Sequence, residues 1–213
     1  LFVDHEEMSE RYVTFFFFDN EGEILFERRI DLICNQRQTI DLSAFLLDSK
    51  CAFGTFCVFH SYTPKVVSDL GSFITERGYV SYRHNGSPLL AYVHGNMDAI
   101  SLWLDKSMKM LGVKSFLPRE FRVQHELLGP ALYEIGVVNS SSKVQHLSCQ
   151  ILSSQSGEIL DIYKAVMLPR GVHIFQVKIE QSAAARIIIK SHLVMARPLV
   201  FRINNHKMDV FHG

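Results

Sequence analysis

The fold is decided by the stretch Tyr12-Val13-Thr14-Phe15-Phe16-Phe17-Phe18, which runs into the turn residues Asp19-Asn20-Glu21-Gly22. β-Branched and aromatic residues favour strands, whereas acidic residues, Asn and Gly favour tight turns. Residues 23–32 have the pattern of the returning strand, so the stretch predicts a hairpin. Because side chains alternate along a strand, the four Phe place two rings on each face. We expect a central strand buried on both faces, or an edge strand covered by another part of the chain.

Short apolar runs separated by turn residues continue along most of the chain. The further strands that we expect are 39–42, 54–60, 79–83, 89–94, 121–127, 131–138, 144–152, 158–167, 172–179, 186–194, 198–203 and 208–211. Asn85-Gly86 lies between two of them and favours a hairpin, because both residues tolerate positive φ. Strands at roughly eight- to twelve-residue spacing, without regularly alternating helices, are typical of sandwiches and barrels. The sequence therefore predicts a mainly β protein.

One segment, 96–112, departs from this pattern. Its apolar residues repeat at three- and four-residue spacing, as on one face of a helix. They are Met97, Ile100, Leu104, Met108 and Leu111. Asn96 or Asp98 fits the N-terminal cap and Gly112 the C-terminal end of such a helix, which we predict as a link between two halves of the chain. The competing interpretation is a strand over 99–104 followed by a loop.

Two sequence patterns occur twice. Gly22-Glu23-Ile24-Leu25 recurs as Gly157-Glu158-Ile159-Leu160, each time after an apolar strand and a polar turn. An aromatic-Arg-x-Asn pattern followed by His-Gly occurs at residues 82–95 and again at 201–213. Between these patterns, residues 56–61 align with residues 187–192 at an offset of 131. The offset falls from 135 at the glycines to 118 at the His-Gly pairs, which places an insertion in the first copy around residues 62–76.

This repetition predicts an internal duplication. We expect two tandem β-sandwich-like or jelly-roll-like units, 1–96 and 113–213, joined by the linker 97–112. The extra residues of the first copy belong in a surface loop, where insertions accumulate and where function is often located.

The overall charge and the cysteine content limit the binding partners and the cellular compartment that we expect. Lys plus Arg and Asp plus Glu both number 22, so the chain offers no broad attraction to nucleic acid or to an anionic membrane. No apolar run approaches the roughly 18 residues of a membrane span. The four cysteines form no C-x-x-C pair, and this usage favours a reducing, cytoplasmic compartment. The acidic, mixed start of the chain does not have the pattern of a signal peptide.

The repeated polar residues are the candidate ligand-binding set: Arg83, Asn85, His94, Arg202, Asn204 and His212. Arg binds a carboxylate or phosphate through a fork of N–H groups, and His adds a proton or a metal bond. The competing interpretation is structural: the Asn residues form turns, and Arg and His support the hairpins as cross-strand neighbours. We favour the structural interpretation, because turn chemistry explains the Asn residues without a ligand.

Specific catalytic and cofactor motifs are absent from the sequence. It contains no G-x-S-x-G, H-E-x-x-H or G-x-G-x-x-G pattern, so we expect no cofactor and favour a protein that is not an enzyme. Several histidines lie near expected strand ends, namely His60, His84, His94, His192, His206 and His212. His206 and His212 form the tightest group with Asp209, but there is no H-x-H pair and we assign no metal ligands.

Three functions are compatible with these observations. The first is a non-enzymatic binding or accessory module that recognises a glycan, a peptide or a protein partner. The second is a metal-binding β-barrel protein or enzyme that uses the strand-end histidines. The third is a structural domain that forms an oligomer, including a homo-oligomer, through its Phe-rich faces.

Overall fold

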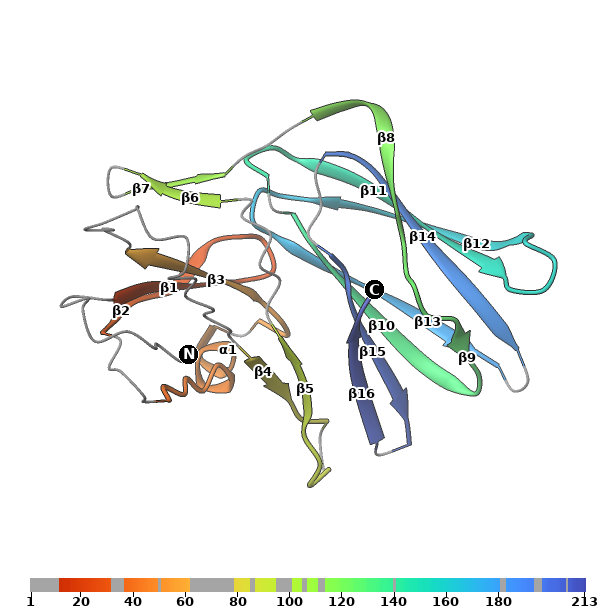
Figure 1. Ribbon diagram of the computed structural model, residues 1–213, viewed down its shortest axis with the longest axis horizontal. Helices are drawn as coiled ribbons and strands as arrows, with labels where there is room; N and C mark the ends of the chain where they lie inside the picture. Colours follow the sequence, from red (N-terminus) through yellow and green to blue (C-terminus); the bar gives the residue numbers. More distant parts are fainter. Residues whose placement is uncertain are drawn as a thin grey trace, which may run out of the picture.

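The computed structural model describes residues 12–31, 37–49, 51–61, 79–84, 87–94, 101–104, 107–110, 114–139, 141–180, 183–193, 197–205 and 207–213. Within these ranges the protein is mainly β, as predicted, with a single seven-residue helix, α1 (Ser43–Ser49). Figure 1 shows the first sheet of the chain and α1 on one side of the molecule and the strands of the second half on the other.

The first sheet has the order β2-β1-β3. Its strands are β1 (Tyr12–Phe18), β2 (Ile24–Asp31) and β3 (Thr55–Ser61). The predicted hairpin and the central, doubly buried strand are confirmed, because the four Phe rings are at most 4% exposed. Phe15 and Phe17 pack with residues of α1 on one face, while Phe16 and Phe18 form a separate cluster on the other. Burial of such side chains stabilises a fold by about 1.5–3 kcal/mol each.

The predicted strand over 39–42 is wrong, because these residues lead into α1 instead. The carboxylate of Asp41 accepts hydrogen bonds from the backbone N–H of Ser43 at 3.0 Å and from its hydroxyl at 2.6 Å, and so begins the helix. Leu42, Phe45 and Leu46 then reach the cluster around Phe17. Their three- and four-residue spacing is that of one helix face.

Two short hairpins follow the first sheet. One pairs β4 (Tyr79–Tyr82) with β5 (Ala91–His94), as expected, and the other pairs β6 (Ser101–Leu104) with β7 (Ser107–Met110). The predicted helix over 96–112 is therefore wrong at residues 101–104 and 107–110. Short apolar runs fit the helical and the strand period equally well, and here cross-strand pairing decides between them. The competing strand over 99–104 agrees with β6 at the described residues 101–104, but the loop expected after it is wrong at residues 107–110, which form β7.

Residues 114–213 form a β-sandwich. Its strands are β8 (Lys114–Arg122), β9 (Leu127–Leu128), β10 (Ala131–Val138), β11 (Gln145–Ser153), β12 (Ile159–Met167), β13 (Val172–Ile179), β14 (Ala184–Leu193), β15 (Leu199–Asn204) and β16 (Lys207–His212). The two sheets have the orders β13-β10-β15-β16 and β12-β11-β14-β8, and β9 also pairs with β14. Buried residues alternate along β10 and β11 and meet in one core, in which Tyr133, Ile135, Cys149 and Ile187 are at most 1% exposed.

The single strand predicted over 121–127 is divided in two. β8 ends at Arg122, and β9 begins at Leu127. Both pieces pair with β14, at its two ends, so the chain has to bend between them. This bend places residues 125–128 beside the end of the sandwich.

The two halves share a strand pattern. The order β2-β1-β3 corresponds to β12-β11-β14, and both hairpins contain a register shift near the turn. Gly22 and Gly157 lie in these turns with φ of 91° and 74°. Thr55 pairs with the residue before the first turn and Arg186 with its counterpart before the second, which reproduces the offset of 131 expected from the sequence.

The internal duplication itself stays a prediction. In the first half the described residues form one three-stranded sheet and separate hairpins. A complete sandwich in that half stays a prediction. The halves meet where the backbone N–H of Val172 donates to the carbonyl oxygen of Asn20 at 3.0 Å and where β5 lies beside β16.

Candidate functional site

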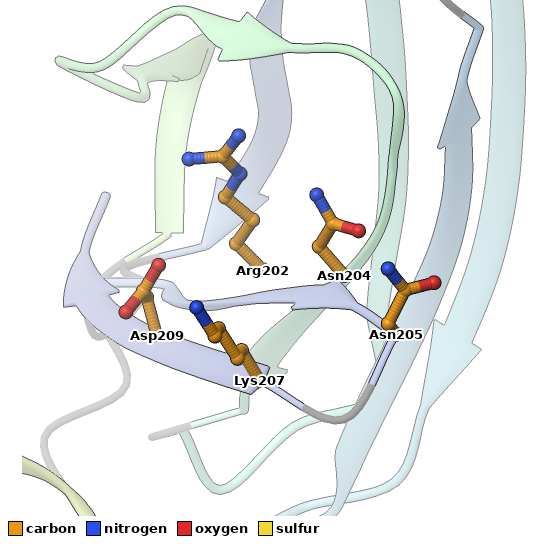
Figure 2. Close-up of a pocket in the computed structure, with 5 residues that line it drawn as sticks. All are labelled: Arg202, Asn204, Asn205, Lys207 and Asp209. Carbon is orange, nitrogen blue, oxygen red and sulfur yellow. The ribbon is translucent and has the colours of Figure 1, made fainter.

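A pocket of about 370 Å³ lies on the β15–β16 hairpin. It is lined by Arg202, Asn204, Asn205, Lys207 and Asp209, whose side chains rise from the hairpin in Figure 2. Arg202 pairs with Asp209 in the ladder, and Asn204 pairs with Lys207. Directly paired residues point to the same face of a sheet, so these four side chains share one face.

An adjoining pocket of about 290 Å³ extends this site towards the β8–β9 bend. It shares Arg202 and Asp209 and is also lined by His125, Glu126, Leu128, Tyr133 and Phe211. The Tyr133 hydroxyl donates to the carbonyl oxygen of Leu128 and accepts from its N–H, both at 2.9 Å. These two bonds fix β9 against the core. The site thus lies at the end of the sandwich, between elements of both sheets.

Arg202 and its ladder partner Asp209 line both pockets, and Arg202 is distinguished from Asp209 by a buried polar atom. Its Nε atom is buried and has no hydrogen-bond partner among the described residues. An unsatisfied buried donor costs a protein about 1–3 kcal/mol, and such a group often marks a place for a ligand or a water molecule. The sequence singled out Arg202 but gave no sign of its burial.

The charges around Arg202 leave one positive charge in excess. Arg202 and Lys207 are cationic and Asp209 is anionic. Glu126 is paired with Arg186 at 3.2 Å, so this pair is neutral. The site therefore complements a ligand group with one negative charge.

The histidines of the candidate set lie elsewhere. His212 is on the opposite face of β16 from Asp209, because residues 209 and 212 differ in parity along the strand. It meets His94 of β5, with ring centroids 4.6 Å apart, and its Nε2–H donates to the His94 carbonyl oxygen at 2.8 Å. His212 Nδ1 is buried without a partner in the described part of the chain. Burial lowers the pKa of His212, as do the nearby charges of His94 and Arg197, whereas the hydrogen bond to His94 acts in the opposite direction.

The first-half members of the set are not brought to the pocket. Arg83 is exposed, next to the end of β4, and Asn85 lies outside the described residues. The backbone N–H of Ser87 donates to the carbonyl oxygen of His84 at 2.9 Å, which is the bond that closes a four-residue turn. The β4–β5 hairpin instead contacts the second half through Tyr82, whose ring packs edge-on against Phe201 at 4.9 Å. Burial raises the pKa of Tyr82 to about 12.

Turn chemistry explains part of the second-half set. Asn205 has φ of 55° and follows the last residue of β15, a conformation that Asn tolerates well. Asn204, in contrast, is a strand residue that lines the pocket. Turn conformation thus accounts for Asn205, and both interpretations of Arg202 and Asn204 stay predictions.

Sequence reasoning missed Lys207 altogether and considered Asp209 only as a metal ligand. Both would have followed from the register of the hairpin, which pairs Asn204 with Lys207 and Arg202 with Asp209. Leu128 and Tyr133, which form one wall of the second pocket, had no signal in the local sequence, because this wall arises from the packing of two sheets.

The described residues contain no group of three or more His, Cys, Asp or Glu side chains placed to hold a metal. His206 lies outside them, and Asp209 and His212 point to opposite faces of β16. The metal hypothesis therefore stays an untested prediction. Burial raises the pKa of Cys57 to about 11 and that of Cys149 to about 12, which keeps both thiols protonated at neutral pH.

No helix in the described part of the chain has both the length and the apolar character needed to cross a membrane. Comparisons with protein-family models, with curated proteins and with solved structures found no match to this chain.

Proposed function

We propose that this protein is a non-enzymatic binding module whose ligand occupies the pocket at Arg202. The observation that carries the proposal is the buried, unpartnered Nε of Arg202, in a site with one excess positive charge. Amide groups of Asn204 and Asn205 stand beside it as additional donors and acceptors. A few convergent polar groups next to an apolar wall are typical of ligand sites.

The composition of the pocket favours binding over catalysis. No Ser, Thr or Cys is among its described lining residues, so it offers no nucleophile of those kinds. The hydroxyl of Tyr133 is already engaged with both backbone groups of Leu128. What the pocket provides is charge and hydrogen bonding in a fixed arrangement.

The test is a binding screen of the full chain against a glycan array and a peptide library, followed by titration of each ligand found. Arg202→Ala is expected to weaken binding about tenfold or more, because a hydrogen bond to a charged group contributes about 1.5–3 kcal/mol. Arg83→Ala is the matched control, since it removes the corresponding Arg of the first half, and should leave affinity unchanged. Equal affinities of the wild type and Arg202→Ala would refute the proposal.

A second candidate function, self-association, is favoured by the surface of β12. This strand pairs only with β11 among the described strands, and it carries a row of exposed apolar residues. They are Ile159, Leu160, Ile162 and Val166, between 46% and 62% exposed. Large exposed apolar patches mark interaction surfaces. The carboxylate of Asp161 already accepts the backbone N–H of Ile162 at 2.8 Å, which favours contact through the apolar face over pairing of strand edges.

Solution mass tests this second candidate. A concentration-dependent dimer that Ile162→Lys converts into a monomer is the expected result. A strict monomer of the wild type at high concentration would remove self-association through β12.

A further inference from the structure

We infer that the ligand of the Arg202 pocket is a sugar residue that carries a carboxylate, such as a hexuronic acid. This inference rests on the proposed binding function and specifies its ligand. It comes from three properties of the site: its excess charge, the order of its polar groups and its apolar wall.

The charge selects a monoanion. Arg202 presents a planar fork of N–H donors, which matches the two oxygens of a carboxylate. Asp209 faces Arg202 directly across the ladder, so a dianionic group on Arg202 would meet a carboxylate at close range. One excess positive charge therefore suits a carboxylate better than a phosphate.

The remaining polar groups of the pocket are suited to hydrogen bonds with the hydroxyl groups of a ligand. The Asp209 carboxylate accepts hydrogen bonds only, and the amides of Asn204 and Asn205 both donate and accept. A sugar ring supplies neighbouring hydroxyls that act in both ways, whereas an acidic peptide offers few such groups next to its carboxylate. Lys207 adds donors at the rim, opposite Asn204 in the ladder.

The wall provides the apolar contact that a sugar ring requires. Leu128 is 49% exposed at the end of β9, where two hydrogen bonds to Tyr133 hold it in place. Phe211 lies beside it and is itself held by an edge-on contact with the His125 ring at 5.0 Å. The carbon-bound hydrogens of a ring that reaches Arg202 can pack against this wall.

The experiment is an NMR titration of the full-length chain with two matched series of sugars. Each series contains a hexuronate, the neutral hexose with the same stereochemistry and the hexose 6-phosphate, in the gluco and the galacto configurations. In at least one series we expect the hexuronate to bind about tenfold or more tightly than the hexose, the discrimination that one charge-assisted contact provides. The 6-phosphate should bind more weakly than the hexuronate.

Substitutions test which residues cause the preference for the hexuronate. Arg202→Ala should abolish the preference for the hexuronate, Asp209→Asn should strengthen binding of the 6-phosphate, and Arg83→Ala should change neither. An unchanged melting temperature of each variant establishes that the fold is intact.

Each contrary result has a separate meaning. Equal binding of hexose and hexuronate overturns the carboxylate inference but leaves a sugar-binding function standing. Tighter binding of the 6-phosphate overturns it in favour of a phosphate site. If no sugar binds in either series, the sugar inference is refuted, and the screen of peptides against Arg202→Ala then decides whether the proposed binding function survives.

Discussion

Two glycines in corresponding turns have different surroundings. Both Gly22 and Gly157 have positive φ, which costs a residue with a Cβ about 1–2 kcal/mol. A Cβ at Gly157 would meet nothing within 4 Å, whereas one at Gly22 would collide with the carbonyl oxygen of Pro169. Gly22 therefore carries a packing requirement, between the first turn and the second half, in addition to its conformational one.

The predicted consequence is an unequal pair of substitutions. Gly157→Ala should lower the free energy of unfolding by about 1–2 kcal/mol, from backbone strain alone. Gly22→Ala should lower it by more than that, because the Pro169 loop has to move as well. Urea denaturation of both variants measures the difference, and equal losses would contradict the close contact.

Protonation of His212 makes stability depend on pH. Its pKa is lowered in the folded state, chiefly by burial, and so is the pKa of His173. The unfolded chain then binds more protons than the folded one as pH falls below about 6.5, so stability decreases. Above that pH both states are neutral at these positions and the effect disappears.

We expect the free energy of unfolding to fall between pH 7 and pH 5, and His212→Gln and His173→Gln each to reduce that fall. Chemical denaturation at a series of pH values provides the measurement. A slope that is the same in the wild type and in both variants would be inconsistent with this assignment.

At the scale of single residues, the sequence located Arg202 and Asn204 but not the pocket that contains them. Repetition of aromatic-Arg-x-Asn identified these positions. The exclusion of His212 from their group follows from strand parity, which requires the register of the β15–β16 hairpin. Lys207 could be predicted as a pocket residue only from the register of the hairpin. Leu128 could be predicted only from the packing of the two sheets.

Among the elements, β1 is the one whose character follows most directly from its sequence. Its neighbours β2 and β3 pair along its whole length, and α1 covers the face that bears Phe15 and Phe17. Phe16 and Phe18 are equally buried on the other face. The guanidinium of Arg170 lies 5.6 Å from the centroid of the Phe18 ring, so a residue of the second half covers part of this face.

Because both faces are buried, Phe16→Ala and Phe17→Ala should destabilise the protein to a similar extent, about 3–5 kcal/mol each. Tyr92→Ala, at a residue of β5 that is 56% exposed, is the control and should change stability by less than about 1 kcal/mol. Thermal and urea unfolding will compare them. A near-neutral Phe16→Ala would mean that this face is open.

Elements were predictable where alternation and turn residues agree. The strands over 131–138 and 172–179 have the bounds expected from sequence. Buried and half-buried positions alternate along the first, and buried and exposed positions alternate along residues 175–179 of the second. The segments 39–42 and 96–112 failed for a common reason. In each, the spacing of the apolar residues fits more than one period, and a capping carboxylate or a pairing partner decides between helix and strand.

On the scale of the whole molecule, the second half contains its own core. The largest buried cluster runs from Val123 to Val200 and draws on both sheets of the sandwich, without a residue from the first half. Among the described residues, contacts between the halves include the pairs Asn20–Val172, Tyr82–Phe201 and His94–His212, together with the approach of Gly22 to Pro169 and of Arg170 to the Phe18 ring.

A fragment comprising residues 114–213 should consequently fold alone and unfold cooperatively, with lower stability than in the full chain. Circular dichroism and a sigmoidal urea transition would establish this. A fragment that lacks a cooperative transition would show that the first half is required for the sandwich to form.

The duplication was inferred from two short sequence matches and stays a prediction, although the halves share a strand order and a register shift near the turn. The sheet β2-β1-β3 is covered by α1, whereas the corresponding strands β12-β11-β14 pack against the sheet that contains β10 and β13. This difference was not predictable from the sequence, because the two copies differ most in the segments that cover these sheets. The pocket lies in the half where a second sheet meets the first.

The central claim is that a ligand binds at Arg202, and the Nε–H resonance of this residue reports on it most directly. The resonance can be assigned by its loss in Arg202→Lys and followed while the tightest ligand from the screen is added to the full chain. We predict that it shifts progressively and saturates together with the backbone signals of Asn204 and Asp209. A resonance that stays fixed while other signals saturate would place the ligand elsewhere and contradict the account.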